Sequence, residues 1–201
     1  MRHALPVRRE VADGPADPGL SEAGRAQSER LAAYLSSERI DALYSSPMRR
    51  AVQTAMPIGD AHHLSVEIEE DVAEWDRHSN EYIPVEELKR ANDPRWQQLI
   101  DGIRPDGAPN AAEFQAVVVA ALERLISSHS SQRVAVVCHG GVINAYLAHV
   151  LGIGPATEFF YPNYTSIHRV AAARTGERSI LSVNETAHLR GTGLPIGMYH
   201  G

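Results

Sequence analysis

The chain has 201 residues, of which 43% are hydrophobic, so it can bury a sizeable core and falls within the size range of a single domain. Its 19 basic and 25 acidic residues give a net charge of -6, the wrong sign for a surface that binds nucleic acid through its phosphates. A lone cysteine cannot form an internal disulfide, and no basic start followed by an apolar run suggests a secretory signal, so a reducing, cytoplasmic location is expected. The longest apolar stretch, residues 116–122, is far shorter than the roughly 20 residues that span a bilayer, which predicts no membrane segment.

The first half of the chain alternates between loops, helices and strands. Residues 5–20 are rich in proline, glycine and charge, which predicts a long loop. Ser21 offers an N-cap oxygen for a helix that is expected to end near residue 37. The next expected elements are a strand, a helix and a second strand, over residues 40–45, 48–61 and 66–69.

The second half begins with a segment of a different kind. Residues 70–107 are polar and interrupted by prolines, so we expect short helices that pack as a cap over one edge of the domain. Asn110 with Glu113 three residues later approximates a capping box in front of a helix with a clear apolar stripe. A buried strand, a helix and a two-stranded hairpin are expected after it, over residues 133–138, 140–151, 167–173 and 179–183.

This alternation predicts a single domain over residues 1–201 with an α/β fold. The expected architecture is a three-layer α/β/α sandwich, in which a mostly parallel central sheet is covered by helices on both sides. Ligands of such open sheets bind outside the carboxyl ends of the strands. Residues that carry chemistry are therefore sought where strands end.

Arginine, histidine and paired glycines occur at three such places. Arg2 and His3 open the chain, Arg50 lies in the first turns of the helix expected after the strand at residues 40–45, and residues 139–141 (HGG) follow the most convincing buried strand. A helix N-terminus favours negative charge, a guanidinium can hold two phosphate oxygens at once, and glycines let the backbone approach a ligand closely. Together the three places are suited to a phosphate group.

The order and spacing of these segments resemble the signature of the histidine phosphatase superfamily. The matching segments are Arg2-His3, residues 45–55 (SSPMRRAVQTA) and 139–141 (HGG), with weaker similarity at 20–27 (LSEAGRAQ) and 184–189 (NETAHL). The resemblance covers most of the chain and thins between residues 76 and 107. It implies a phosphoglycerate-mutase-like fold and a phosphatase that hydrolyses phosphate monoesters of small molecules, without a metal ion or another cofactor.

Carried over residue by residue, the resemblance implies that His3 is the nucleophile and forms a phosphohistidine. Arg2, Arg50, His139 and Gly140 are implied to bind the phosphate, and His139 also counts among the catalytic residues. Fixed positive groups are what such a site needs, because a phosphate dianion repels nucleophiles and the charge of the transition state must be held by preorganised donors.

Two assignments are left open: which carboxylic acid donates the proton, and whether an arginine of the long loop also binds the phosphate. Glu74 is implied as the acid and base, because its segment, residues 72–76 (VAEWD), is similar to that of the family, and Asp76 is the competing donor. A carboxylic acid that stays protonated near neutral pH can protonate the leaving alkoxide and then activate water. Arg8 or Arg9, from the long loop, is an alternative phosphate ligand.

Two other functions are compatible with the same motifs. A cofactor-dependent phosphoglycerate mutase is the runner-up, although such enzymes usually have a longer cap and carry asparagine where Arg9 stands. A catalytically silent binding domain of the same fold is the third hypothesis. Family members have a strand before their arginine and histidine, whereas only Met1 precedes them here. Either the true start lies upstream, or the chain has been trimmed, or the sheet lacks that strand and His3 is poorly held.

Cysteine and metal chemistry are less well supported. Cys138 lies at a strand end, but a cysteine-dependent phosphatase needs an arginine six residues later, where the chain has Asn144. The adjacent His62 and His63 would point in different directions, and no spacing of carboxylates and histidines resembles a closed set of metal ligands.

Substrate selectivity is expected from the cap and from the long loop. The aromatic candidates for contact with the substrate are Trp75, Tyr82 and Trp96. Trp96 stands at helical spacing from Leu99 and Ile103, which favours a place in the core. Residues 159–161 (FFY) are either a packing segment or the contact of a homodimer.

Overall fold

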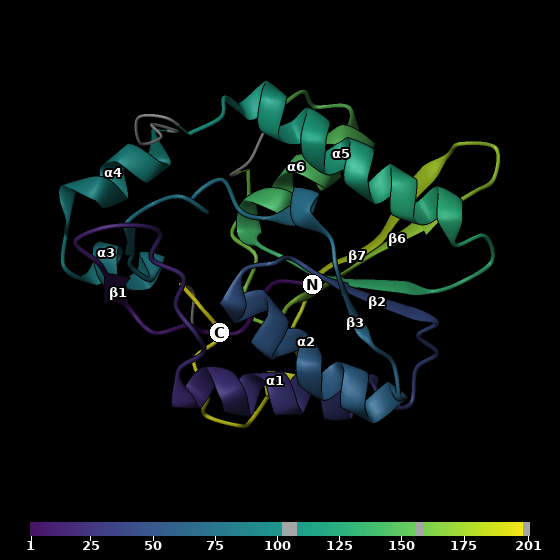
Figure 1. Cartoon of the computed structure of the whole chain (residues 1–201), viewed down its shortest axis with the longest axis horizontal. Coiled ribbons are helices and arrows are strands. Elements are labelled where there is room, and N and C mark those ends of the chain that lie inside the picture. The colour runs from purple at the N-terminus through teal and green to yellow at the C-terminus, as the bar shows by residue number, and fades with distance from the viewer. Residues whose placement is uncertain (102–107, 156–158, 199–201) are drawn as a thin grey trace.

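The computed structural model describes residues 1–101, 108–155 and 159–198. Its central sheet consists of parallel strands in the order β3-β2-β5, with the bounds Val66–Ile68, Ala42–Ser45 and Val134–Val137. Helices α1 and α2 cover one face and helices α5 and α6 the other (Figure 1), with the bounds Glu22–Leu35, Arg49–His62, Ala111–Ser128 and Gly140–Leu151. The predicted three-layer α/β fold is thereby confirmed.

Local sequence explains where the two best-predicted helices begin. The side chain of Ser21 accepts a hydrogen bond from the backbone N–H of Gly24, which caps α1. Before α5, the side chain of Asn110 accepts from the backbone N–H of Glu113 at 2.9 Å, and the Glu113 carboxylate accepts from the N–H of Asn110 at 3.4 Å. The predicted capping box is present.

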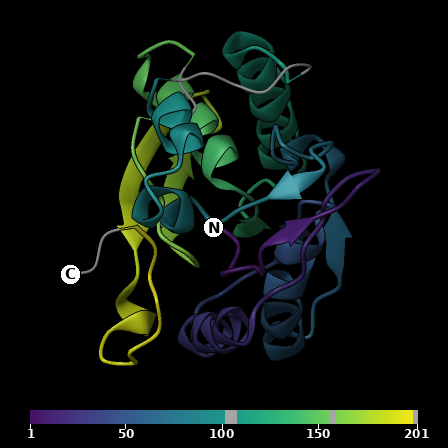
Figure 2. The ribbon, with the colours of Figure 1, turned by 90° about the vertical axis from the view of Figure 1, so that its left-hand side faces the viewer.

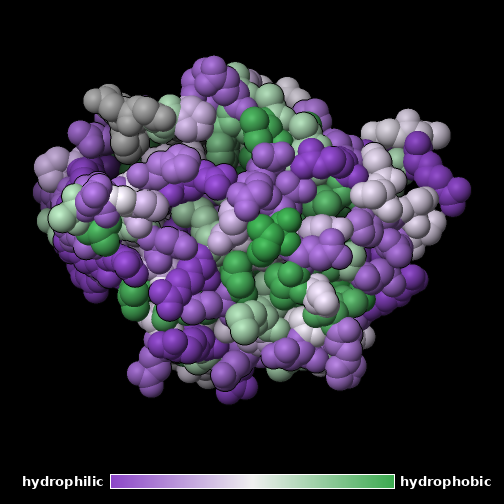
Figure 3. Space-filling view, in the orientation of Figure 1, coloured by the Kyte–Doolittle hydropathy of each residue, from purple (hydrophilic) through white to green (hydrophobic). Residues whose placement is uncertain are grey.

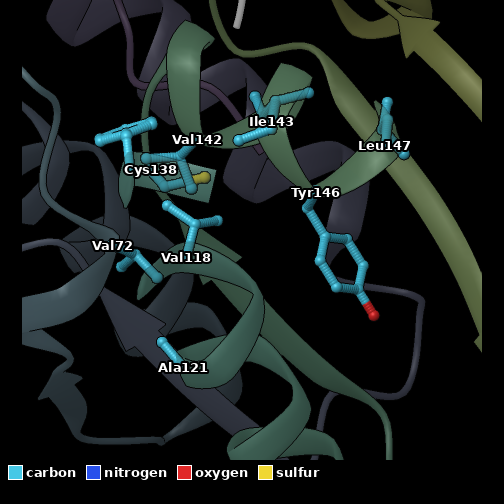
Figure 4. Packing of buried hydrophobic residues seen from close by; sticks show 10 residues of the cluster. Val72, Val118, Ala121, Cys138, Val142, Ile143, Tyr146 and Leu147 are labelled. Atoms are coloured by element: carbon cyan, nitrogen blue, oxygen red, sulfur yellow. The ribbon is translucent and has the colours of Figure 1, made fainter. Parts of the chain in front are cut away.

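Two clusters of buried hydrophobic residues fix the helices to the sheet. One lies between α5 and α6 and the sheet (Figure 4), where Val118 and Ala121 pack with Val142, Tyr146 and Cys138. The other lies under α1 and α2, and its members include Leu31, Leu35, Ala51, Ala55, Ile58 and Leu43. Because β2 and β5 are covered on both faces, their end residues, where the site forms, sit on a rigid base.

The first three residues run beside β5 as a further short segment of the sheet. The amino group of Met1 donates to the carbonyl of Val136 at 2.7 Å, and the N–H of His3 donates to the carbonyl of Cys138 at 2.9 Å. On the other side, the N–H of Arg2 donates to the carbonyl of Ser166 at 3.1 Å. His3 is thus held by backbone hydrogen bonds at the carboxyl end of this segment.

An antiparallel hairpin follows on that side. It consists of β6 (Ile167–Ala172) and β7 (Arg178–Glu185), close to the predicted strands, and a short 3-10 helix, η2 (Ala187–Leu189), comes after it. On the opposite side of the sheet β3 is the outer strand. There Ile68 is half-exposed, and hydrophobic residues gather on this face of the molecule (Figure 3).

The predicted cap contains the expected short helices and one unexpected pairing. Its described elements are η1, β4, α3 and α4, with the bounds Glu70–Val72, Glu81–Tyr82, Val85–Arg90 and Pro94–Ile100. Strand β4 pairs antiparallel with β1 (Arg9–Glu10), which arises from the predicted loop, and Figure 2 shows the two arrows next to each other. Residues 102–107 of the predicted cap lie outside the described part. Within the described ranges, no helix has the length and apolar character needed to cross a membrane.

Candidate active site

His3 is buried at the carboxyl end of the N-terminal segment, with 3% of its surface exposed. Its Nδ1 lies 2.8 Å from the carbonyl oxygen of Ala4, so a proton on Nδ1 is donated to that carbonyl and Nε2 keeps its lone pair. Burial lowers the pKa of His3 well below its usual value, and the positive charges of Arg50 and Arg2 lower it further. The imidazole is therefore neutral, with Nε2 available for attack.

Arg2 is held by stacking. Its guanidinium carbon lies 4.3 Å from the centre of the Tyr164 ring and 4.7 Å from that of the Tyr161 ring, and Nη1 donates to the carbonyl of Pro162 at 2.5 Å. Its Nε is buried and has no hydrogen-bond partner among the described residues. Arg2 can therefore offer a further donor to a bound anion.

Arg50 reaches the same place from the first turn of α2. It is 1% exposed, its Nη2 donates to Oδ1 of Asp76 at 3.0 Å, and its guanidinium carbon lies 4.6 Å from the centre of the Tyr82 ring. Its Nε and Nη1 are buried without a partner among the described residues. An unsatisfied buried donor costs about 1–3 kcal/mol, so the orphaned groups of Arg2 and Arg50 mark a site built to receive an acceptor.

His139 is the N-cap residue of α6 and is fully buried. Its Nε2 lies 2.7 Å from Oγ of Ser46, which already accepts from the backbone N–H of Met48 at 3.2 Å. When Ser46 donates its hydroxyl proton to Nε2, the imidazole proton is on Nδ1, an atom without a partner among the described residues. Burial, together with the charge of Arg50 and the neighbouring His3, lowers the pKa of His139 well below its usual value. His139 is therefore a neutral donor, and its ring centre lies 5.1 Å from that of His3.

Glu74 is buried and accepts two backbone hydrogen bonds. Its Oε2 accepts from the N–H of Gly141 at 2.8 Å and its Oε1 from the N–H of Trp75 at 3.2 Å. Burial raises the pKa of Glu74 to about 7, the negative charge of Asp76 raises it too, and the hydrogen bond from Gly141 partly offsets both. Glu74 can therefore hold a proton near neutral pH. Asp76 forms an ion pair with Arg50 instead, so the geometry favours Glu74 as the proton donor.

The two glycines after His139 differ in their surroundings. A Cβ at position 141 would overlap Oε1 of Glu74, whereas a Cβ at position 140 would meet only the Pro162 ring, at 4.0 Å. Both glycines line the cavity, and Gly141 in addition lets the helix N-terminus approach the carboxylate.

These groups meet at one end of a cavity of about 760 Å³. Arg2, His3, Arg50, Glu74 and Gly140 line it, as do the three aromatic residues expected in the cap, and His139 lies next to His3. The structure therefore brings the predicted central residues together from segments far apart in the chain.

Arg8 and Arg9 lie elsewhere. Arg8 is half-exposed and forms ion pairs with Glu10 at 2.5 Å and with Glu87 at 3.9 Å. Arg9 is exposed on β1, and neither arginine lines the cavity. The structure thus gives no support to either of them as a phosphate ligand.

Comparison with known proteins now identifies the family. A sequence profile of the histidine phosphatase superfamily (branch 1) matches residues 1–186. Phosphoserine phosphatase 1 of Hydrogenobacter thermophilus is 31% identical over 179 residues, which cover 88% of this chain and 85% of that protein. The chain belongs to the histidine phosphatase superfamily.

Solved structures of other superfamily members have the same fold. A phosphoserine phosphatase from Entamoeba histolytica in complex with phosphoserine superposes with a TM-score of 0.71 at 24% identity, covering 94% of this chain and 96% of that chain. A mycobacterial glucosyl-3-phosphoglycerate phosphatase superposes with a TM-score of 0.72 at 21% identity, covering 92% and 96%. The chain is a histidine-phosphatase-type enzyme of the phosphohydrolase class, and the mutase alternative is not favoured.

The structure corrects the expected place of Trp96 in this histidine phosphatase and shows where residues 159–161 lie. Trp96 is not a core residue: α4 has no buried residue, and the partly exposed indole lines the cavity. Ile103, part of the reason for that expectation, lies outside the described residues. Residues 159–161 form a cavity wall, in which the Asn144 side chain accepts from the N–H of Phe160 at 3.1 Å and donates to its carbonyl at 3.0 Å.

The thiol considered for cysteine chemistry does not line the cavity. Cys138 is buried in the core beside α5 and α6, and burial raises the pKa of its thiol. Within the described ranges, no group of three or more histidine, cysteine and acidic side chains is placed to hold a metal ion.

Proposed function

We propose that this enzyme hydrolyses phosphate monoesters of small molecules through a phosphohistidine on His3. The observation that carries the proposal is the neutral, buried His3, which lines the same cavity as Arg2 and Arg50, next to unpartnered nitrogens of Arg2, Arg50 and His139. A phosphoryl group in such a site is held by preorganised positive charge and N–H groups, which is how proteins stabilise phosphoryl transfer.

In the first step Nε2 of His3 attacks the phosphorus atom and the bond to the leaving alcohol oxygen breaks. The phosphoryl oxygens accept from the guanidinium groups of Arg2 and Arg50, from Nδ1 of His139 and from the backbone N–H of Gly140, which as the first residue of α6 has no partner within the helix. The departing alkoxide takes the proton of Glu74.

In the second step water attacks the phosphorus of the phosphohistidine. Glu74, now a carboxylate, takes a proton from that water, the bond from phosphorus to Nε2 breaks, and His3 returns to its neutral form with inorganic phosphate as the product. The pKa of Glu74 near 7 suits both roles, because a group with this pKa gains and loses a proton readily at neutral pH.

The remaining expectations belong to the same proposal. The positive groups above would make a metal ion unnecessary, the composition suggests a cytoplasmic enzyme, and a homodimer without a nucleic-acid partner stays a prediction of the sequence. Residues 1–201 are proposed to form a single catalytic domain.

The decisive experiment is a search for the covalent adduct. We expect the wild-type protein to hydrolyse para-nitrophenyl phosphate in EDTA and, on rapid quenching, to carry an acid-labile phosphoryl group that mass spectrometry assigns to His3. The His3→Ala variant should show neither turnover nor adduct, whereas His149→Gln, at an exposed histidine of α6, should match the wild type. An adduct on another residue, or turnover by His3→Ala, would contradict the proposal.

A further inference from the structure

The cavity extends well beyond the groups that would hold the phosphoryl group. Its volume of about 760 Å³ lies within the range of about 300–1,000 Å³ that is usual for sites of drug-sized ligands. A phosphoryl group with a three-carbon amino acid, such as phosphoserine, would leave much of this space empty. The size of the cavity therefore points to a larger leaving group.

The outer part of the cavity is mostly apolar. Its walls come from the cap and from the segment after α6, and the largest side chains are Trp75, Ile83, Trp96, Leu99, Phe159 and Phe160. Phe159 is 41% exposed, and its ring lies 5.0 Å from that of Phe160. Aromatic side chains that stay accessible at a cavity wall offer a stacking surface to an apolar ligand.

The positive charge of Arg95, in the outer cavity, is already paired with two carboxylates. Nη1 of Arg95 donates to Glu81 at 2.8 Å, while its Nε and Nη2 donate to the carboxylate of Asp93 at 2.9 and 2.7 Å. One guanidinium between two carboxylates leaves this cluster with a net negative charge. Of the described residues that line the outer cavity, Arg95 is the only arginine or lysine, and the nearby ammonium of Lys89 lies 5.6 Å from the centre of the Trp96 ring without lining the cavity itself.

We propose that the preferred substrate is a phosphate monoester of a bulky, uncharged alcohol with an aromatic or aliphatic body, rather than phosphoserine. The proposal rests on the proposed function, because it assumes that the ester phosphate is bound by Arg2 and Arg50. The apolar walls then take the body of the alcohol out of water, and the paired Arg95 disfavours an anionic one.

The test compares three esters of primary alcohols: ethyl phosphate, 2-phenylethyl phosphate and O-phosphoserine. Because all three leave as primary alkoxides that need a proton, differences in kcat/KM report mainly on contacts with the body of the alcohol. We expect kcat/KM for 2-phenylethyl phosphate to exceed that for each of the other two at least tenfold, mainly through a lower KM.

Variants locate the contact. Trp96→Ala should remove most of the advantage of 2-phenylethyl phosphate over ethyl phosphate, through a loss of kcat/KM that is much larger for the phenylethyl ester than for the ethyl ester. Gln97→Ala is the matched control in the same helix, because its side chain bonds to Asp101 and does not line the cavity. Melting curves of both variants check that the protein still folds.

The outcomes separate the two proposals. If para-nitrophenyl phosphate and ethyl phosphate are hydrolysed but phosphoserine is turned over as well as or better than 2-phenylethyl phosphate, the substrate class is wrong and the phosphatase stands. An unchanged preference in Trp96→Ala would also overturn the assignment of the contact. If no ester is hydrolysed, the proposed function itself fails.

Discussion

At the scale of single residues, burial has opposite effects on the two groups that titrate in this site. It makes the charged form of each group costly, so it lowers the pKa of His3 and raises that of Glu74 to about 7. The result is a neutral imidazole beside a protonated carboxylic acid, the pair of states that attack and departure require. The buried positive charge of Arg50 strengthens the effect at His3 and opposes it at Glu74.

This assignment predicts a pH profile that depends on the leaving group. Between pH 7 and 9 about nine-tenths or more of the substrate is the dianion, since its second pKa is about 6, so the profile in this range reports mainly the enzyme. For ethyl phosphate kcat/KM should fall as pH rises above about 7, because Glu74 loses the proton that the alkoxide needs. For para-nitrophenyl phosphate, whose leaving group needs no proton, it should stay nearly flat. Steady-state kinetics with the two esters gives this comparison directly.

Substitutions distinguish the two candidate donors. Glu74→Gln should lower kcat/KM for ethyl phosphate by about 10²–10⁴-fold and leave a burst of nitrophenolate from the aryl ester, because water activation is lost as well. Asp76→Asn removes the ion-pair partner of Arg50 and should lower kcat/KM for ethyl phosphate and for para-nitrophenyl phosphate by the same factor. If the loss that depends on the leaving group appears in Asp76→Asn instead, Asp76 is the donor.

At the scale of elements, the N-terminus of α6 carries three functions in three residues: the donor His139, the open N–H of Gly140 and the bond from Gly141 to Glu74. Alanine is favoured over glycine inside a helix by about 1 kcal/mol, so helix propensity alone would make either glycine replaceable. The surroundings decide otherwise at position 141, where a Cβ would overlap Glu74.

Gly141→Ala should therefore lower kcat for alkyl phosphates by at least about tenfold, since a small misplacement of a catalytic group is costly. Gly140→Ala keeps the backbone N–H and has room for its methyl group, so its loss should be smaller. Kinetics of both variants, with circular dichroism as a folding control, test this difference. Equal losses in the two variants would show that the contact with Glu74 does not matter.

The same scale shows what sequence patterns can and cannot predict. The capping box at Asn110 and the apolar stripe of α5 involve residues close to one another in the chain, so they can be predicted from the sequence. Strands β1 and β4 have two residues each, too few to show a period. The spacing of Trp96 identifies a helix face but not what that face meets, and here it meets a cavity instead of the core.

At the scale of the whole molecule, the candidate site could be predicted because each of its main segments follows a strand, and parallel strands end at one edge of a sheet. What could not be predicted are contacts between segments distant in the chain, such as Arg2 against Tyr161 and Tyr164 or the hydrogen bond from Gly141 to Glu74. No local pattern encodes such pairs.

The raised pKa of Glu74 should also make the free energy of unfolding depend on pH. Its pKa is higher in the folded protein than the usual 4.5, so the folded state disfavours the charged form, and stability falls as pH rises from about 4.5 to 7. Glu74→Gln removes this fall. Relative to wild type, the variant should gain up to about 3 kcal/mol between pH 4.5 and pH 8, measured by denaturant unfolding at both pH values. A difference between the two proteins that does not change with pH would contradict the raised pKa.

The position of His3 in the sheet has a consequence for synthesis of the protein. Its backbone N–H is bonded to the carbonyl of Cys138, and its carbonyl accepts from the N–H of Thr165 at 3.4 Å. His3 thus finds these partners only when segments more than 130 residues later in the chain have emerged from the ribosome. Helices α1 and α2 can form much earlier, but a growing chain has no place for the proposed nucleophile, so the proposed site is completed as one of the last events of folding.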